Sequence, residues 1–492
     1  MTSSPNTPPG PARTLSARDW GVLLVLCGAI FLEGIDVAML NVALPSIRAD
    51  LGLSTGSLQW VMSAYVLGYG GFMLLGGRAA DLFGRRQMFV FWLTVFLLFS
   101  GLGGLASEDW TLIVARFVTG VAAAFMTPAG LSIITTRFAE GPQRNKALLI
   151  YSGTGAGGFS IGLVAGGLLT SAGWRWVFFA PVVLSAVILL AALVLVPRSP
   201  RPDRTTGRPV DLAGGLTVTA AIVLIVLCVE RASHTSSVQT VLTLGAGLAA
   251  LLAFFMVERR SADPLVRLGI LRSGALVRAN LAALLFSAGF FGFQFLVVLY
   301  LQELRDWSTL QTSFAMLVIG IDAILSPVLI PRLVARFGNA RLILAGLLVT
   351  ALSYGLFLRV DADWTYLAML PSLLLLGLAF ALTYGPLTIV ATEGVAEAEQ
   401  GLAGGLLYTS FQFGAALGLS ATTAVNVAAT ASSAPAALLD GYRAALWVPL
   451  AAALLAVLVA AFGVRTRAGT AVIASAEQHP ADRPTAGLPT PH

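Results

Sequence analysis

The chain has 492 residues, of which 57% are hydrophobic and only 11% are charged. Ordinary globular domains carry about 25% charged residues, so these proportions exclude a multidomain soluble protein and predict a polytopic membrane protein. The net charge of +6 does not indicate a nucleic-acid surface, because the cations occur in short groups between apolar runs, as membrane topology signals do.

A helix that crosses the hydrocarbon core needs about 20 mostly apolar residues. Fourteen runs of this kind occur along the chain, and each predicts a transmembrane helix. In chain order they cover residues 20–44, 57–77, 88–106, 110–134, 146–172, 176–196, 211–230, 238–257, 279–301, 310–331, 341–358, 364–390, 402–426 and 443–464.

The cations between these runs alternate from one side to the other. With the N-terminus in the cytoplasm, 23 of the 30 lysines and arginines fall on the inner side and six on the outer side, and Arg116 lies within a span. This asymmetry predicts that both termini are cytoplasmic. The inner loop at 391–400 is the exception, because it carries three glutamates and no cation.

A weak internal repeat divides the chain into two halves. Residues 77–86, after the second span, and 331–340, after the tenth, each contain basic residues and a Phe-Gly pair. Such repeats are typical of secondary transporters, whose substrate site lies between the halves near the midplane. The predicted units are a disordered cytoplasmic tail (1–19), a six-helix bundle (20–197), a linker with two extra helices (198–278), a second six-helix bundle (279–465) and a disordered cytoplasmic tail (466–492).

Three ionisable side chains lie within spans of the first half. Glu33 and Asp36 are one turn apart on one face of the first span, and Arg116 lies in the fourth. An ionised carboxylate in the bilayer costs on the order of 2.5–3.5 kcal/mol, and burial favours its neutral form, which suits proton exchange. At 1.5 Å per residue, Arg116 and Asp36 lie roughly 9 and 12 Å from the outer ends of their spans, so they can meet. The alternatives are a purely structural acid–base pair and an arginine that reaches toward the outer surface.

The second half offers one acid near the middle of a span, Asp322, and several polar and aromatic side chains. A substrate cavity lined by them is one interpretation, and ordinary packing or lipid contact is the other. The candidate lining residues are Gln294, Tyr384, Gln412, Phe290, Phe291, Phe293 and Tyr408.

These motifs together resemble the major facilitator superfamily, specifically its fourteen-helix drug:proton antiporter family, over residues 20–465. Asp36 stands in a first-helix motif that ends Asn-x-Ala-Leu-Pro, and Arg116 opens an Arg-x-x-x-Gly signature. The resemblance implies an all-α membrane protein with two six-helix bundles plus two linker helices. It also implies that Asp36 and Arg116 couple protons, and that Asp322 holds a cationic substrate or a second proton. Glu33 joins the predicted proton-coupling residues because it lies one turn before Asp36 on the same face of the helix.

The resemblance further implies a conformational switch in two places. One is the loop after the second span, where glycines permit a tight turn and an acid and arginines lock neighbouring helix ends together. The other is the fifth span, where small residues four apart let two helices approach closely. Leu82 and Leu163 depart from the family pattern, which has a cation and a proline there. The switch residues are Gly77, Asp81, Gly84, Arg85, Arg86, Gly158, Gly162, Gly166 and Gly167.

The predicted function is proton-coupled export of drugs or amphipathic, cationic small molecules across a bacterial inner membrane, by a monomer that alternates access. Export of a host secondary metabolite or lipid is the alternative, and a proton symporter fits the fifth span less well. The sequence has no phosphate-binding loop, and its three histidines lie in a loop or the tail, so we expect no enzymatic activity, cofactor, metal or nucleic-acid partner.

Overall fold

A computed structural model describes residues 16–53, 55–198, 212–231, 237–261, 269–270, 273–432 and 434–477. Within these ranges the chain is helical and contains no strand. Ser16 caps the first helix, since its hydroxyl accepts a hydrogen bond from the Asp19 amide and the Asp19 carboxylate accepts one in return. The predicted all-α membrane fold is confirmed.

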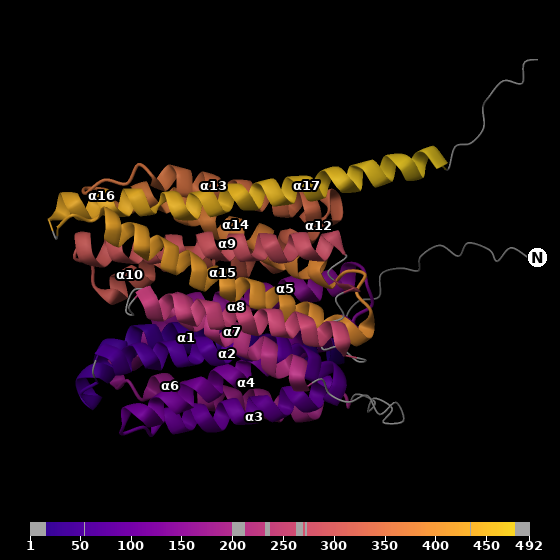
Figure 1. Cartoon of the computed structure of the whole chain (residues 1–492), viewed down its shortest axis with the longest axis horizontal. Coiled ribbons are helices and arrows are strands. Elements are labelled where there is room, and N and C mark those ends of the chain that lie inside the picture. The colour runs from indigo at the N-terminus through magenta and orange to yellow at the C-terminus, as the bar shows by residue number, and fades with distance from the viewer. Residues whose placement is uncertain are drawn as a thin grey trace, which may run out of the picture.

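The first six helices form one bundle, which is coloured indigo to purple in Figure 1. Within it α1 packs on α5 and α6, while α4 packs on α2 and α3. The helices are α1 (Ala17–Leu51), α2 (Thr55–Phe83), α3 (Arg85–Gly104), α4 (Asp109–Arg137), α5 (Pro142–Ala172) and α6 (Trp176–Leu195).

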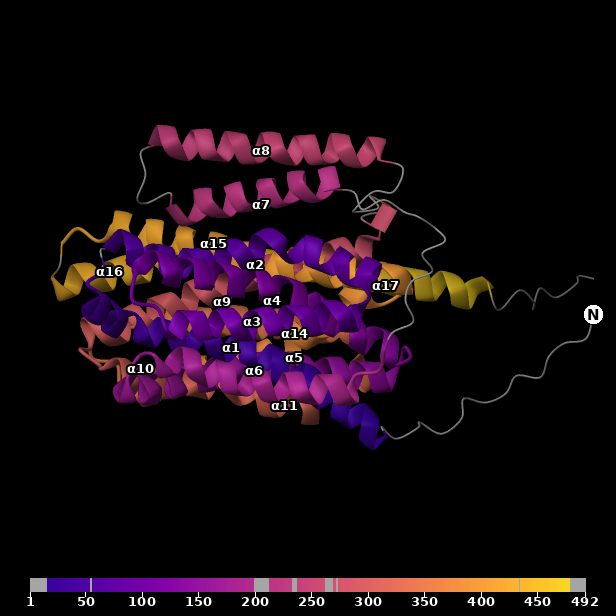
Figure 2. The same ribbon diagram turned by 90° about the horizontal axis from the view of Figure 1, so that it is seen from below.

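Two further helices, α7 (Leu212–Arg231) and α8 (Ser237–Arg260), form a hairpin. Helix α7 packs on α2 and on α15 (Gln400–Ala429), whereas α8 lies outermost at the edge of the molecule (Figure 2). By length and composition, thirteen helices of the described chain can cross a membrane. The remaining predicted span corresponds to α7, whose apolar stretch, Ala213–Ile225, is shorter than the others.

The second bundle contains the later helices, coloured orange to yellow in Figure 1. Helix α9 packs on α15 and α17, and α13 packs on α14. The elements, besides α15, are α9 (Gly274–Leu299), η3 (Tyr300–Leu304), α10 (Thr309–Met316), η4 (Leu317–Ile321), α11 (Asp322–Val328), α12 (Ile330–Phe337), α13 (Asn339–Phe357), α14 (Tyr366–Thr392), η5 (Glu397–Glu399), α16 (Pro435–Ala445) and α17 (Trp447–Glu477).

The predicted span at 310–331 is not a continuous α-helix. A 3₁₀ segment, η4, separates α10 from α11, and Asp322 is the first residue after it. A Cβ added to Gly320 would lie 2.8 Å from the Ser160 side chain of α5, so η4 is pressed against the first bundle. Short 3₁₀ stretches within helices often mark functional hinges.

The C-terminal boundary also differs from the prediction. Helix α17 continues to Glu477, whereas the disordered tail was expected to begin at residue 466. The segment after Arg467 is rich in alanine, which has the highest helix propensity of all residues, and this outweighs its lack of a long apolar run. The rest of that predicted tail, 478–492, lies outside the described residues, as do residues 1–15 of the N-terminal tail.

Candidate functional site

A cavity of about 950 Å³ lies between the two bundles. Its wall follows α15 from Tyr408 to Ala428, close to the end of that helix, and also includes Asn41 and Met62 near the α1–α2 connection. We call this the open end of the molecule. The opposite end, where α2 ends at Phe83 and α15 begins at Gln400, is called the gate end.

Asp36 and Arg116 form a buried ion pair next to the cavity. The Arg116 Nη1 atom donates a hydrogen bond of 2.6 Å to Asp36 Oδ2, and each residue is 2% exposed. The Arg116 guanidinium also lies 4.4 Å from the ring centre of Tyr65, which adds a cation–π contact. Arg116 lines the cavity and Asp36 does not. Arg116 therefore meets its predicted partner and does not extend toward the surface.

Glu33 has a different environment from Asp36, although both belong to α1. It lines the cavity, and its carboxylate accepts a hydrogen bond from the hydroxyl group of Thr127. The two acids thus have separate partners: the Arg116 cation pairs with Asp36, and the neutral Thr127 hydroxyl bonds to Glu33.

Most of the predicted substrate residues lie around the same cavity. The exception is Phe293, which stacks on Tyr354 with ring centres 4.7 Å apart and contacts Phe357 inside the second bundle. Phe293 therefore points from α9 toward α13 and packs inside the second bundle. The neighbouring aromatic residues of α9 face the cavity instead. The predicted residues that line the cavity are Asp322, Gln294, Tyr384, Gln412, Phe290, Phe291 and Tyr408.

Several wall residues were not predicted. Phe380 lies between Phe290 and Tyr384, with ring centres 4.8 Å from each, and Tyr384 is followed by Phe411 at 4.7 Å. These rings form a continuous aromatic wall on the second bundle. Their signal in the sequence is weak, because aromatic residues also face lipid. Tyr65, Tyr69, Asn41 and Phe159 extend the wall on the first bundle.

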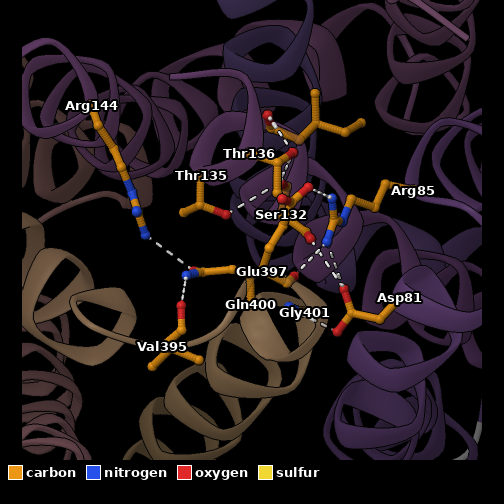
Figure 3. Close-up of polar contacts among 11 residues, drawn as sticks. Asp81, Arg85, Ser132, Thr135, Thr136, Arg144, Val395, Glu397, Gln400 and Gly401 are labelled. Carbon is orange, nitrogen blue, oxygen red and sulfur yellow. Dashed lines mark hydrogen bonds and ion pairs between the residues drawn. The ribbon is translucent and has the colours of Figure 1, made fainter. Parts of the chain in front are cut away.

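Polar contacts join the two bundles at the gate end (Figure 3). The backbone N–H of Gly401 donates a hydrogen bond of 3.1 Å to Asp81 Oδ2. Arg85 bonds to Asp81 on its own side and to both the carbonyl (2.6 Å) and the carboxylate (3.4 Å) of Glu397 across the interface. The unusual acidic loop at 391–400 therefore supplies the partner of a switch arginine.

Arg144 makes a second set of contacts across the gate end. Its Nη2 atom donates to the Thr392 carbonyl (3.0 Å) and to Gln400 Oε1 (3.1 Å), and its Nη1 atom pairs with Glu140. Glu140 in turn accepts a hydrogen bond from the Gly394 amide. In the sequence Arg144 resembles any other inner-loop cation, so it is not among the predicted site residues.

The remaining switch residues of the α2–α3 loop have separate positions. Gly77 of α2 lies against Gly401 of α15, so close that a Cβ on either glycine would overlap the carbonyl oxygen of the other. Gly84 adopts φ +97°, which lets the chain turn from α2 into α3. Arg86 points away from the interface and bonds to the carbonyls of Leu193 and Val196 at the end of α6.

The glycines of the fifth span form a packing face. Gly158, Gly162 and Gly166 lie against the α1 backbone, where an added Cβ would come within 2.7 Å of an α1 atom. Gly167 instead faces Leu310 of α10, on the second bundle. Leu163 stands where the family pattern has proline, and it lines the cavity while α5 continues without a break.

Comparisons with known proteins agree with this architecture. The model of the Major Facilitator Superfamily matches residues 26–419. The puromycin resistance protein pur8 of Streptomyces alboniger is 38% identical over 444 residues, which cover 86% of each chain. The cephamycin export protein CmcT of Amycolatopsis lactamdurans is 36% identical over 451 residues, which cover 89% of this chain and 90% of that protein.

Among solved structures, the human organic anion transporter MFSD10 has a TM-score of 0.68 at 15% identity, covering 90% of this chain and all of that one. At that identity the likeness shows the fold alone. The family model and the curated relatives together identify the chain as a member of the Major Facilitator Superfamily.

Proposed function

We propose that this protein exports amphipathic small molecules from the cell in exchange for protons. The observation that carries this proposal is the cavity between the bundles, which is closed at the gate end and has ionisable groups of α1, α4 and α11 in or next to its wall. The names of the two relatives, a resistance protein and an export protein, support export. Transport accounts for this arrangement without any catalytic step.

The orientation of the molecule in the membrane follows from its charges. The gate end carries Arg85, Arg86 and Arg144, and the positive-inside rule assigns such loops to the cytoplasm. On this assignment both ends of the chain are cytoplasmic, and the cavity faces the outside of a bacterial inner membrane. This is the state that releases substrate and takes up a proton.

The gate contacts hold this outward-facing state. Asp81 accepts a hydrogen bond from Gly401, and Arg85 donates one to Glu397, so both contacts join the first bundle to the second. Gly77 packs directly against Gly401, which brings α2 and α15 into contact. When these contacts open, the cavity becomes accessible from the cytoplasm. The glycine face of α5 lets α1 slide along α5 during this movement while the two helices stay packed together.

The aromatic wall and the acids define the substrate class. Flat aromatic side chains bind apolar ring systems, and Asp322 supplies a negative charge opposite the first bundle. An amphipathic molecule with a basic group matches both features. The protein functions as a monomer in this scheme, because one chain contains the whole cavity.

The test is export of ethidium and of puromycin from cells or vesicles, with and without a proton uncoupler. Export that stops when the proton gradient collapses supports the proposal. Export that persists without a gradient, or that needs ATP, contradicts proton coupling.

A second candidate is a dedicated exporter of a metabolite that the host itself produces, and the name of the cephamycin export relative favours it. Both candidates use the same cavity and the same gate. A panel of chemically unrelated substrates separates them, since a dedicated exporter accepts one class and a multidrug exporter accepts many.

Reporter fusions test the topology. Fusions after Arg86 and after Arg341 are expected to report a cytoplasmic location, because both residues lie in the first turn of a helix at the cation-rich inner end. A fusion after Asp50, in the last turn of α1, is the control and is expected to report the outside. A periplasmic signal after Arg86 or Arg341 would contradict the proposed orientation.

Asp322→Asn tests the substrate class. We expect this change to weaken binding of cationic substrates by about tenfold and to leave neutral ones nearly unchanged, since it removes a charge and keeps the shape. The measurement is binding of ethidium and of a neutral dye to the purified protein. Equal losses for both molecules would show that Asp322 has a structural role.

A further inference from the structure

We propose that Glu33, and not Asp36, is the carboxyl group that takes up and releases the transported proton, while Asp36 is a positioning residue. This assignment rests on the proton coupling proposed above. It goes beyond the family motif, which contains Asp36.

The surroundings of Asp36 favour a permanent charge. Its carboxylate lies 2.6 Å from Arg116, and both residues are almost fully buried. A proton added to Asp36 would weaken a charge-assisted hydrogen bond and leave the Arg116 guanidinium without a counter-ion in a buried place. Tyr65 holds Arg116 from its ring face, so the cation has little freedom to find another partner.

The surroundings of Glu33 accept either protonation state. Its partner is the hydroxyl group of Thr127, which donates to the carboxylate. A hydroxyl group also has lone pairs, so after a bond rotation it accepts a hydrogen bond from the protonated acid. Glu33 can therefore gain or lose a proton without leaving a buried group unsatisfied.

The two acids also differ in their access to the cavity. Glu33 lines the cavity, which extends to the open end, whereas Asp36 lies behind the wall. Water in the cavity can thus deliver a proton to Glu33 in the outward-facing state. Two carboxylates one turn apart repel each other, so one negative charge is favoured here, and Arg116 keeps that charge on Asp36.

The groups that face Glu33 come from both bundles. From the first bundle they are Asp36, one turn away on α1, and the cavity residues Tyr65, Tyr69 and Arg116; from the second, Asp322, Tyr384 and Tyr408 line the same cavity. Phenols remain neutral near pH 7, so Arg116 is the one cation in this described set, and Asp36 already pairs with it. A change of charge on Glu33 therefore acts where the two bundles meet, which links protonation to their relative movement.

Labelling with dicyclohexylcarbodiimide tests the assignment without any transport substrate. This reagent modifies protonated carboxyl groups in apolar sites, and peptide mass spectrometry locates the product. For the full-length protein in detergent we expect modification of Glu33 that falls as the pH rises, and no modification of Asp36. Labelling of Asp36, or of neither acid, would overturn the assignment.

Variants of the partner residues provide the control. Thr127→Val removes a hydroxyl that stabilises ionised Glu33, so the pH at which labelling falls is expected to move upward, and Thr127→Ser is expected to restore it. A merely structural Thr127 would leave that pH profile unchanged.

Transport provides a second and separate readout. Glu33→Gln is expected to lose the stimulation of ethidium transport by an imposed pH gradient. Persistent stimulation in Glu33→Gln would overturn the assignment. If the unmodified protein showed no gradient-driven transport, the proposed proton coupling itself would fail, whatever the labelling pattern.

Discussion

Gly401→Val is expected to abolish export while the protein still inserts and folds. Gly401 faces Gly77 and Asp81 at the gate end, where an added Cβ would overlap the Gly77 carbonyl and lie 2.8 Å from an Asp81 oxygen. Overpacking of a close contact costs about 1–3 kcal/mol, which shifts a two-state equilibrium by about 5- to 150-fold. The shift favours the state in which the gate end is open, so the outward-facing state is depopulated.

Hydrogen exchange of the backbone amides reports this shift directly. In the closed gate the amides of Gly394 and Gly401 donate to Glu140 and Asp81, so both are protected. Peptides that contain these amides are expected to exchange faster in Gly401→Val than in the unmodified protein.

A matched control exists in α13. Gly355 is also a helical glycine, but a Cβ built there meets no atom within 4 Å. Gly355→Val is therefore expected to export normally and to exchange like the unmodified protein. Normal export by Gly401→Val would show that the close approach of α2 and α15 is dispensable.

The sequence predicts the fold well because the membrane reduces the number of possible structures. A run of about 20 apolar residues in lipid must satisfy its backbone groups internally, so it forms a helix. The ion pair of Asp36 and Arg116 is predictable for a related reason. Two opposite charges at a similar depth in hydrocarbon have few other partners, and the structure brings them together.

The gate was only half predictable. Asp81 and Arg85 stand in a recognisable loop, but their partners lie more than 300 residues away in sequence and belong to no motif. The one local signal was an anomaly: the inner loop with Glu397 lacks the cations that every other inner loop carries. Glu397 is explained by a contact with the other bundle, which a count of charges per loop does not reveal.

The cavity wall shows a second limit. Phe290, Phe291 and Phe293 occupy one stretch of α9, yet the first two line the cavity and the third packs against α13. Hydropathy does not distinguish these faces, because lipid, a bundle core and an aromatic cavity all favour the same side chains. Only the packing of the neighbouring helices decides which way each ring points.

A double substitution at Asp36 and Arg116 separates the two possible roles of that ion pair. Asp36→Asn alone leaves the buried Arg116 without its counter-ion, and breaking a buried pair in this way costs about 3–5 kcal/mol. We therefore expect a large fall in thermal stability in detergent for the single variant. The double variant, Asp36→Asn with Arg116→Gln, removes both charges and is expected to regain most of that stability.

Transport by the double variant then gives the decisive measurement. If Asp36 only positions Arg116 and the surrounding helices, Glu33 is still present, and part of the ethidium transport driven by an imposed pH gradient is expected to return together with the fold. If Asp36 carries the proton, the refolded double variant has lost the carrier and stays inactive under the gradient. A stable, folded double variant without gradient-driven transport would thus assign the proton to Asp36. Recovery of gradient-driven transport would leave Glu33 as the acid of α1 that is able to carry the proton.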